Sequence, residues 1–138
     1  MNDDATAITA LIMEDKNVIR RKSFDFAVRV VKLCQFVSKT HHESVLTRQL
    51  LKSGTSIGAN IRESNNAESG ADFIHKVGIA QKECDETLYW LELMKATGYL
   101  TENEFDSVVK DCNELMKIIR SIILTRKANL KNEKLSKG

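Results

Sequence analysis

Proline is absent from this chain of 138 residues, and aromatic residues make up only 6% of it. A β-rich domain of this size normally separates its strands with proline and with strong turn pairs, which are scarce here. Alanine, leucine, glutamate and lysine, which favour helices, are plentiful. A chain of this length forms one domain with a sizeable core. The composition therefore predicts a single all-α domain.

Cysteine is also scarce: the chain has three, and no two of them form a CxxC pair. Zinc ribbons and dithiol redox motifs need such pairs, so the sequence supports neither. Each cysteine instead lies among apolar residues, where a reduced thiol packs as a small core side chain. Reduced thiols are typical of the cytoplasm, and we expect the protein there. The three are Cys34, Cys84 and Cys112.

Long apolar runs are missing as well. No segment approaches the ~20 apolar residues of a membrane span. The first residues, Met1 to Asp4, lack the basic and then apolar layout of a signal peptide. We therefore expect no membrane partner.

The net charge is only +2, but the charges are unevenly distributed. Residues 16–52 hold nine bases and two acids, whereas residues 53–109 hold four bases and ten acids. Residues 110–138 again favour bases, with eight against three acids. This pattern predicts a basic first helix and a basic C-terminal end, both suited to an acidic partner.

Apolar residues recur every three or four positions, which predicts four helices. Short connections between them predict an antiparallel, up-down-up-down four-helix bundle over residues 17–126. An N-terminal arm, residues 1–16, would precede it, and a disordered basic tail, residues 127–138, would follow it. The helices are expected to begin between Asn17 and Ser23, after an N-cap at Ser44, after Ser69 and after Thr101, and to end near Thr40, Asn65, Lys95 and Arg126.

Local signals support some of these helix ends. Ser69 with Asp72, and Thr101 with Glu104, have the three-residue spacing of a capping box, in which two side chains satisfy free backbone N–H groups. Glycine is typical of the position just past a helix end, and Gly98 fits such a position. These signals predict two sharp helix starts and one sharp stop.

The first helix carries more apolar residues than one buried face requires. They form two adjoining stripes, whereas an ordinary surface helix has one. The pattern predicts burial on more than one side, either in a large core or in a contact between subunits. The stripes are Phe24, Ala27, Val28, Val31 and Cys34, and Phe26, Val30, Leu33 and Val37.

The second helix is centred on the stretch Ser53–Ile61, which contains Gly54 and Gly58. Each glycine costs a helix roughly 1 kcal/mol relative to alanine, so two of them predict close packing against another helix backbone. A loop is the alternative, because the small polar residues there can break a helix. Asn60, if buried, would hydrogen-bond to a neighbouring helix and fix its register; ligand binding is the alternative for this residue.

Candidate metal ligands are few. Suitable residue types occur at His41-His42-Glu43 and at Asp72 with His75. A di-iron bundle needs two acid-x-x-His pairs and two further carboxylates, and the chain has no second pair. The pattern therefore predicts solvated surface groups, with no metal and no cofactor.

Nucleophilic catalysis is not indicated either. Cys84 and His75 are nine residues apart, too far along one helix to touch, and an apolar seam makes a thiol inert. The chain has no G-x-S-x-G, P-loop or G-x-G-x-x-G motif. We therefore expect that the protein is not an enzyme.

Basic residues are the remaining candidates for a binding site. If the first two helices lie side by side, seven of these residues form a face that binds phosphates without sequence specificity. Few aromatic residues accompany them, so base stacking is not indicated. The alternatives are an ordinary solvated surface and a match to the acidic third helix of another subunit. The seven are Arg20, Arg21, Lys22, Arg29, Lys32, Arg48 and Lys52.

Two long motifs resemble the four-helix bundle proteins that are encoded in intervening sequences of bacterial 23S rRNA genes and by free-standing bacterial genes. The first motif is QLLKSGTSIGANIRE, residues 49–63. The second is ADFIHK at residues 71–76, followed by Ala80, Lys82-Glu83 and ETLYWL at residues 86–91. Their order and spacing agree with the family over roughly residues 20–123. Most members have a proline in the turn after the first helix, where this chain has His41-His42-Glu43-Ser44.

The resemblance implies a bundle that assembles into a ring-like homopentamer and has no established catalytic residues. A related protein, the accessory variability protein of diversity-generating retroelements, is similar in fold and binds nucleic acid and a reverse transcriptase through basic surfaces. The first hypothesis is therefore a non-enzymatic homo-oligomer whose basic face binds RNA or DNA, as an accessory to a nucleic-acid enzyme. The second is a protein-interaction scaffold whose basic residues serve subunit assembly only.

Overall fold

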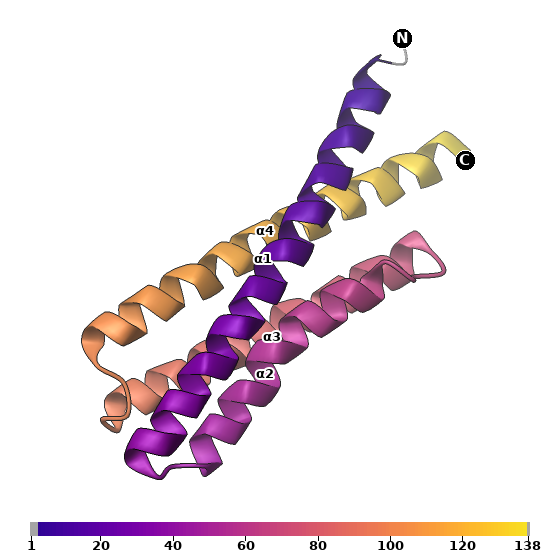
Figure 1. Ribbon diagram of the computed structural model, residues 1–138. Coiled ribbons are helices and arrows are strands. Elements are labelled where there is room, and N and C mark those ends of the chain that lie inside the picture. Colours follow the sequence, from indigo (N-terminus) through magenta and orange to yellow (C-terminus); the bar gives the residue numbers. More distant parts are fainter. Residues whose placement is uncertain (1–2, 138) are drawn as a thin grey trace.

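The computed structural model consists of four helices joined by short turns (Figure 1). We describe residues 3–137, apart from the side chains of residues 3–5, 8, 9, 11, 12, 15 and 137. The all-α prediction is confirmed, since these residues contain no strand. The helices are α1 (Asp3–His41), α2 (Val45–Ser64), α3 (Gly70–Ala96) and α4 (Glu102–Lys137). Each packs against the next along the chain, and α4 packs against α1, as in an antiparallel up-down-up-down bundle.

The first helix begins at Asp3, not between Asn17 and Ser23 as the sequence pattern predicted. Residues 3–16 contain neither proline nor glycine, and acids near a helix start interact favourably with the helix dipole. Nothing in this segment therefore interrupts the helix. The sequence between Ile8 and Met13 is mostly apolar, but most of its side chains lie outside the described ones; Met13 itself is exposed.

The last helix is also longer than predicted, because residues 127–137, expected to be disordered, continue α4 to Lys137. A Cβ atom added to Gly70 would lie 2.7 Å from Leu130 Cδ2, so Leu130 packs on the bare backbone at the start of α3. With 39 and 36 residues, α1 and α4 extend past the turn between α2 and α3, at the end of the bundle where the chain begins and ends (Figure 1). The domain limits at residues 17 and 126 stay a prediction.

The turn between α1 and α2 begins at His42, whose φ of 54° is uncommon for a residue with a side chain. Ser44 is the N-cap residue of α2, as predicted, but its side chain makes no capping hydrogen bond. Glu43 caps the helix instead: its carboxylate accepts hydrogen bonds from the backbone N–H groups of Leu46 (2.7 Å) and Thr47 (3.0 Å). A carboxylate reaches two donors and also interacts favourably with the helix dipole.

The other two helix starts follow the predicted pattern more closely. Thr101 and Glu104 form a reciprocal capping box, with hydrogen bonds of 2.8 and 3.2 Å to each other's backbone N–H. Ser69 Oγ accepts from the N–H of Asp72 at 3.1 Å, as expected. The Asp72 carboxylate, however, accepts from the N–H of Glu68 rather than of Ser69.

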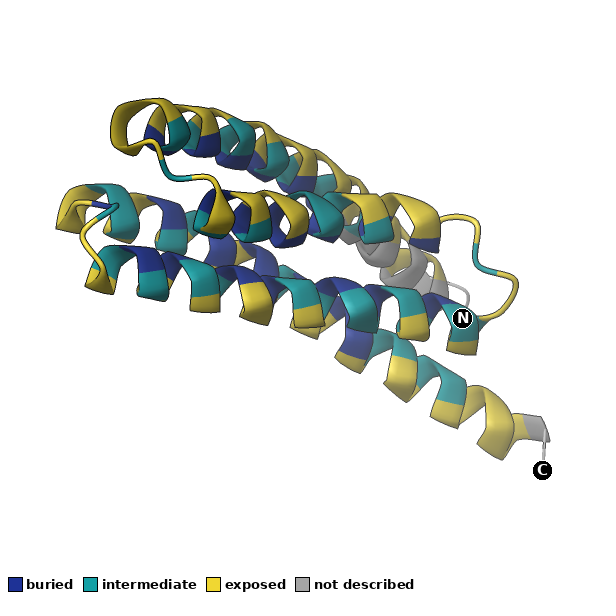
Figure 2. Cartoon of the chain, turned by 90° about the horizontal axis from the view of Figure 1, so that it is seen from below, coloured by how far each residue is buried: buried dark blue, intermediate teal, exposed yellow. Residues whose placement is uncertain are grey.

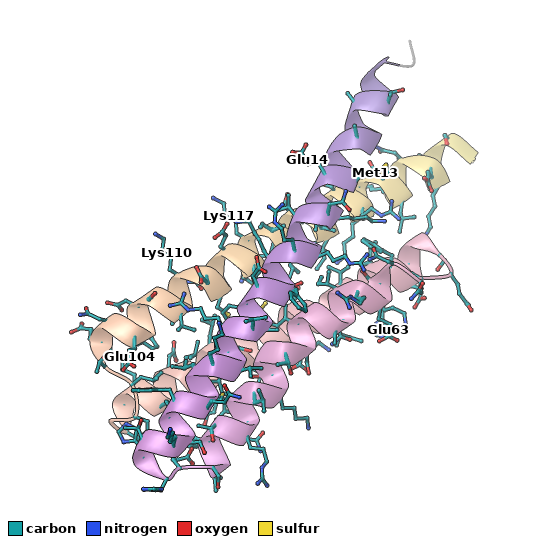
Figure 3. The ribbon with its side chains drawn as sticks, viewed as in Figure 1. Met13, Glu14, Glu63, Glu104, Lys110 and Lys117 are labelled. Atoms are coloured by element: carbon teal, nitrogen blue, oxygen red, sulfur yellow. The ribbon has the colours of Figure 1, made fainter. Side chains whose placement is uncertain are left out.

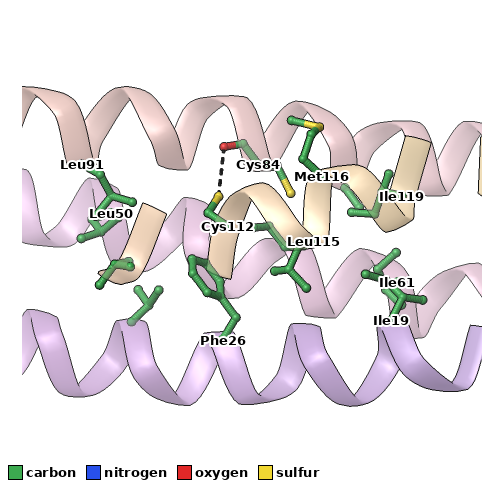
Figure 4. Close-up of a cluster of buried hydrophobic side chains, with 14 of the residues drawn as sticks. Ile19, Phe26, Leu50, Ile61, Cys84, Leu91, Cys112, Leu115, Met116 and Ile119 are labelled. Atoms are coloured by element: carbon green, nitrogen blue, oxygen red, sulfur yellow. Dashed lines mark hydrogen bonds between the residues drawn. The ribbon is translucent and has the colours of Figure 1, made fainter. Parts of the chain in front are cut away.

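The core is one apolar cluster that runs along the inside of all four helices (Figures 2 and 4). Buried positions on each helix face inward and exposed ones face outward, as Figure 2 shows. Two buried hydroxyl groups also lie in the core, on Ser53 of α2 and Thr87 of α3, with 3.1 Å between their oxygens. The large, fully buried apolar side chains include Ile19, Leu50, Ile57, Leu91, Met94, Leu115 and Ile119.

Glycine residues lie where α1 and α2 come closest. Residues 53–61 are inside α2, so the alternative of a loop is wrong. A Cβ atom added to Gly54 would lie 2.8 Å from Val30 Cγ1. One added to Gly58 would lie 3.2 Å from the backbone oxygen of Ser23. Both positions thus leave little room for a larger residue against α1.

Candidate nucleic-acid interface

The seven basic residues predicted to bind phosphates do not form one continuous face. Five lie on α1 and two on α2, and these two helices do pack side by side. Their side chains nevertheless fall into three groups. One group reaches α4, one lines the outer groove between α1 and α2, and one is exposed outside that groove.

The first group, Lys22 and Arg29, is held by acids of α4. Lys22 forms an ion pair with Glu114, and Arg29 forms one with Asp111. Arg29 also donates a hydrogen bond to the carbonyl oxygen of Ser107 at 3.1 Å. Partly exposed pairs of this kind contribute at most about 1 kcal/mol each to stability. They do, however, neutralise two of the cations that the sequence assigned to phosphate binding.

The second group, Arg20 and Arg48, lines the outer groove between α1 and α2. The groove holds two hollows of about 320 Å³ each, one bordered by Arg20 and the other by Arg48. Arg62, which the sequence analysis missed, borders the first hollow with its guanidinium 6.0 Å from the centre of the Phe24 ring. Its signal was its spacing: Arg62 follows Arg48 by 14 residues, about four helical turns, which places both on one side of α2.

The groove and its edge expose apolar side chains. Phe24 is 55% exposed, Val28 is 38% exposed and Leu51 is 37% exposed. Phe24 and Val28 belong to one of the two apolar stripes predicted on the first helix. In the other stripe, Phe26, Val30 and Val37 are buried in the core, and Leu33 packs against it partly buried. Part of the first stripe therefore lacks cover within the described chain.

The third group comprises Arg21, Lys32 and Lys52. Arg21 and Lys32 are exposed and lie eleven residues apart, about three turns, on the same side of α1. Neither forms an ion pair among the described residues. Burial and neighbouring Glu86 raise the pKa of Glu83 on α3, and the charge of Lys52 opposes that rise. Lys52 thus interacts with an acid of α3.

Two further cations, both missed from the sequence, lie where α1 and α4 pass the start of α3. Lys16 Nζ and Arg126 Cζ lie 4.4 and 4.8 Å from the centre of the Phe73 ring. Burial, and then repulsion by Arg126, lowers the pKa of Lys16. The Arg126 Nε atom is buried without a hydrogen-bond partner among the described atoms. The cation–π contact between the Arg126 guanidinium and the Phe73 ring offsets part of the free energy that burying this unpaired atom costs. Lys16, Phe73 and Arg126 come from three different helices, so no local sequence motif indicates this cluster.

Within the part of the chain that the structure describes, Asn60 makes no hydrogen bond to a neighbouring helix. Its Nδ2 donates to the carbonyl oxygen of Ser56, one turn earlier in α2, at 2.7 Å. The register-fixing hydrogen bond was expected of a buried Asn60, and this side chain is only partly buried and bonds within its own helix. Asn60 lies partly exposed at the edge of α2, whereas Ser53 and Thr87 face the core and make the hydrogen bond between helices.

The groups considered for catalysis and metal binding are dispersed. Among the described residues, no three histidine, cysteine, aspartate or glutamate side chains are placed to hold a metal ion. His41 packs edge-on against Tyr99, with ring centres 5.4 Å apart. A hydrogen bond with Cys112, and burial, raise the pKa of the Cys84 thiol, which makes it a poor nucleophile at neutral pH. In the same residues, no helix has the length and apolarity needed to cross a membrane.

Comparison with known proteins shows which family this bundle resembles. The sequence model of the family described as 23S rRNA-intervening sequence protein matches residues 15–121. The chain belongs to this family. The family predicted from residues 49–63 and 71–91 is thereby confirmed. The match leaves out the first part of α1 and the last part of α4. No curated protein matches the chain.

A solved structure resembles this member of the 23S rRNA-intervening sequence protein family in both sequence and fold. It is the crystal structure of a protein of unknown function from the S23 ribosomal protein family of Bacteroides thetaiotaomicron VPI-5482. The two sequences are 50% identical, and the structures superpose with a TM-score of 0.78. The likeness covers 79% of this chain and 97% of that one. Most of this chain therefore shares its fold with that protein.

Proposed function

We propose that this member of the 23S rRNA-intervening sequence protein family is a non-enzymatic, homo-oligomeric bundle that binds RNA or DNA through a basic face, as an accessory to a nucleic-acid enzyme. The observation that carries the proposal is the exposure of Arg21 and Lys32 on one side of α1, without an ion pair among the described residues. Cations held on a rigid helix bind phosphates without reading bases. Because Lys22 and Arg29 are engaged by α4, Arg21 and Lys32 form the centre of the proposed face.

Homo-oligomerisation is part of the proposal, with a pentamer as the expected size. It is supported by the exposed apolar side chains of Phe24, Val28 and Leu51. Complete burial of a fully exposed side chain of this kind is worth about 1.5–3 kcal/mol. These three are 37–55% exposed, so each would gain a part of that amount in a contact between subunits. Arg20 and Arg62 border the hollow beside Phe24, where they would match an acidic surface of a second copy.

Light scattering tests both parts of the proposal. The particle mass of the purified protein would be measured alone and with mixed-sequence RNA and DNA duplexes, at about 50 and 200 mM salt. We expect a multimer at both salt concentrations and uptake of nucleic acid only at the lower one. The variant Arg21→Gln with Lys32→Gln should lose most of the uptake and keep its mass. The matched control, Lys39→Gln with Lys82→Gln, also loses two exposed charges and should bind like the wild type.

The alternative function is a protein-interaction scaffold whose basic residues serve subunit assembly only. It is favoured by the ion pairs Lys22–Glu114 and Arg29–Asp111, because there cations of α1 already serve packing. In that case the particle mass stays the same with and without nucleic acid at both salt concentrations. The variant Arg21→Gln with Lys32→Gln then changes the oligomer mass. This pair of results would reject the nucleic-acid proposal.

A further inference from the structure

We infer that the outer face of α4 is a second phosphate-binding surface, a stripe of cations that lies along the backbone of RNA or DNA. The inference rests on the proposed function and adds a helix to it. The charge pattern of the sequence predicts a basic C-terminal end, but it assigns residues 127–138 to a disordered tail rather than to a helix face. We call this surface the α4 stripe.

The α4 stripe consists of six exposed lysine and arginine side chains in two rows. Within each row the residues are 7 or 14 positions apart, which is close to two or four helical turns. An offset of three positions sets the rows roughly 60° apart around the helix. Lys110 and Lys117 project from α4 on the same side, away from the other helices (Figure 3). The first row is Lys110, Lys117 and Lys131, and the second is Arg120, Lys127 and Lys134.

Two acids of α4 do not offset this charge. Asp111 and Glu114 are paired with cations of α1, so both carboxylates are engaged on the flank that faces α1. None of the six cations forms an ion pair among the described residues. Asp85 of α3 borders the shallow groove beside Lys117 and Arg120, where it offsets part of their charge. Asp106, one turn before Lys110, and Glu133, next to Lys134, are further exposed acids of this helix. Six cations against these two acids and Asp85 leave the outer face of α4 with a net positive charge.

The length of the α4 stripe fits a polyanion. From Lys110 to Lys134 it spans roughly 36 Å at 1.5 Å per residue. This is about one turn of a nucleic-acid duplex, whose phosphates are spaced a few ångströms apart along each strand. The exposed Leu124 interrupts the first row between Lys117 and Lys131. A small anion would contact only two or three of these side chains, whereas the phosphate backbone of a nucleic acid can contact the α4 stripe along its whole length.

The outer half of the α4 stripe lies beyond residue 121, where the family match ends. Lys127, Lys131 and Lys134 are kept in line because the helix continues to Lys137. Leu130, packed on the backbone of Gly70, holds this part of α4 against α3. In a disordered tail these lysines would share no face.

Binding titrations with neutralised variants test the inference. The full chain would be titrated with fluorescent RNA and DNA duplexes and single-stranded RNA of about 25 nucleotides, between about 50 and 200 mM salt. Two variants probe the ends of the stripe: Lys110→Gln with Lys117→Gln, and Lys127→Gln with Lys131→Gln. We expect each to weaken duplex binding by about tenfold or more at the lower salt, and to reduce the salt slope by about two. Lys39→Gln with Lys82→Gln is the matched control and should change affinity less than about twofold.

The outcomes separate this inference from the proposed function. If both α4 variants bind like the wild type while Arg21→Gln with Lys32→Gln weakens binding, the α4 stripe is refuted and the proposed function stands. If the α4 variants weaken binding and the α1 variant does not, the α4 stripe is the binding face and the α1 face is refuted. If the wild type binds no probe at the lower salt, both fall. An α4 variant that changes the particle mass would assign these cations to a subunit contact and overturn the inference.

Discussion

Ser53 and Thr87 place their hydroxyl oxygens 3.1 Å apart across the contact between α2 and α3. Both residues are buried, and each hydroxyl also lies near a carbonyl oxygen of its own helix: Ser53 near Leu50 at 3.3 Å, and Thr87 near Glu83 at 2.7 Å. The pair is a small polar contact inside a largely apolar core. A buried polar group costs free energy unless it is hydrogen-bonded, so the two hydroxyls favour one register of α2 against α3.

The coupling between these hydroxyls can be measured with a double-mutant cycle. Ser53→Ala and Thr87→Val should each lower the free energy of unfolding by about 1 kcal/mol, because each removes one partner of a buried hydrogen bond. The double variant should lose less than the sum of the two, with a coupling of about 0.5–1.5 kcal/mol. Urea denaturation gives all three values. Strict additivity would show that each hydroxyl bonds only to its own helix.

Gly54→Ala and Gly78→Ala should change stability in opposite directions. A Cβ atom at position 54 would press on the buried, β-branched Val30, which has little freedom to move. Overpacking of this kind costs about 1–3 kcal/mol and outweighs the gain of about 1 kcal/mol in helix propensity. At position 78, among the described residues, no atom outside the adjacent residues and the local helix backbone lies within 4 Å of the added Cβ, so only the propensity gain remains. Thermal unfolding of the two variants measures the difference, and a Gly54→Ala variant more stable than the wild type would contradict the close contact.

Removing the Glu43 carboxylate should destabilise the protein, whereas removing the Ser44 hydroxyl should not. Burial would raise the pKa of Glu43, but hydrogen bonds from the N–H groups of Leu46 and Thr47 outweigh it and lower the pKa below 4.5. This carboxylate therefore stabilises the fold above about pH 4.5, and the contribution is lost as the pH falls through its lowered pKa. Glu43→Gln should cost about 1 kcal/mol at neutral pH, and Ser44→Ala less than about 0.5 kcal/mol. Urea denaturation at pH 7 compares the two, and equal losses would reject Glu43 as the cap.

The cysteine thiols should resist labelling in the folded protein. Burial, together with the nearby Glu43 carboxylate, raises the pKa of Cys34 to about 11. Cys84 and Cys112 are buried in the core, where Cys112 Sγ donates to the carbonyl oxygen of Cys84 (Figure 4). Iodoacetamide at pH 8 should leave the native chain unmodified and label all three thiols in concentrated guanidinium chloride, as read by mass spectrometry. Rapid labelling of the native protein would contradict this burial.

The raised pKa of Cys34 also has a consequence for stability. As the pH rises past 9.0, the ordinary thiol value, the unfolded chain loses this proton before the folded one does. The unfolded state then binds fewer protons, so the free energy of unfolding falls between about pH 9 and pH 11. Cys34→Ala should flatten this part of the stability profile.

Features set by neighbours in the sequence could be predicted. Thr101 with Glu104 specifies a helix start through hydrogen bonds within one turn, and the structure contains both. The start at Asp3 was missed because residues 1–16 carry no motif that marks a boundary, and a helix then continues until something stops it. The tail after Arg126 was missed because Leu130 depends on Gly70, sixty positions away in the sequence.

The candidate interface was less predictable than the fold, because charges are neutralised across helices. The sequence places Arg29 and Lys32 three residues apart on one basic helix, yet Arg29 is paired with Asp111 and Lys32 is exposed. The difference follows from which side of α1 faces α4, which the pattern of one helix does not specify. The same reasoning applies to the α4 stripe, because two acids of α4, Asp111 and Glu114, are paired with cations of α1 and so offset less of its charge.

The unequal helix lengths make the two ends of the molecule different. At one end lie the turns around His42 and Gly98. At the other, α1 and α4 project beyond the turn between α2 and α3. A closed ring of parallel copies would therefore have two unlike faces: one formed by the turns, and one from which the first part of α1 and the last part of α4 project. A bulky tag at either end of the sequence would crowd the second face and leave the first accessible.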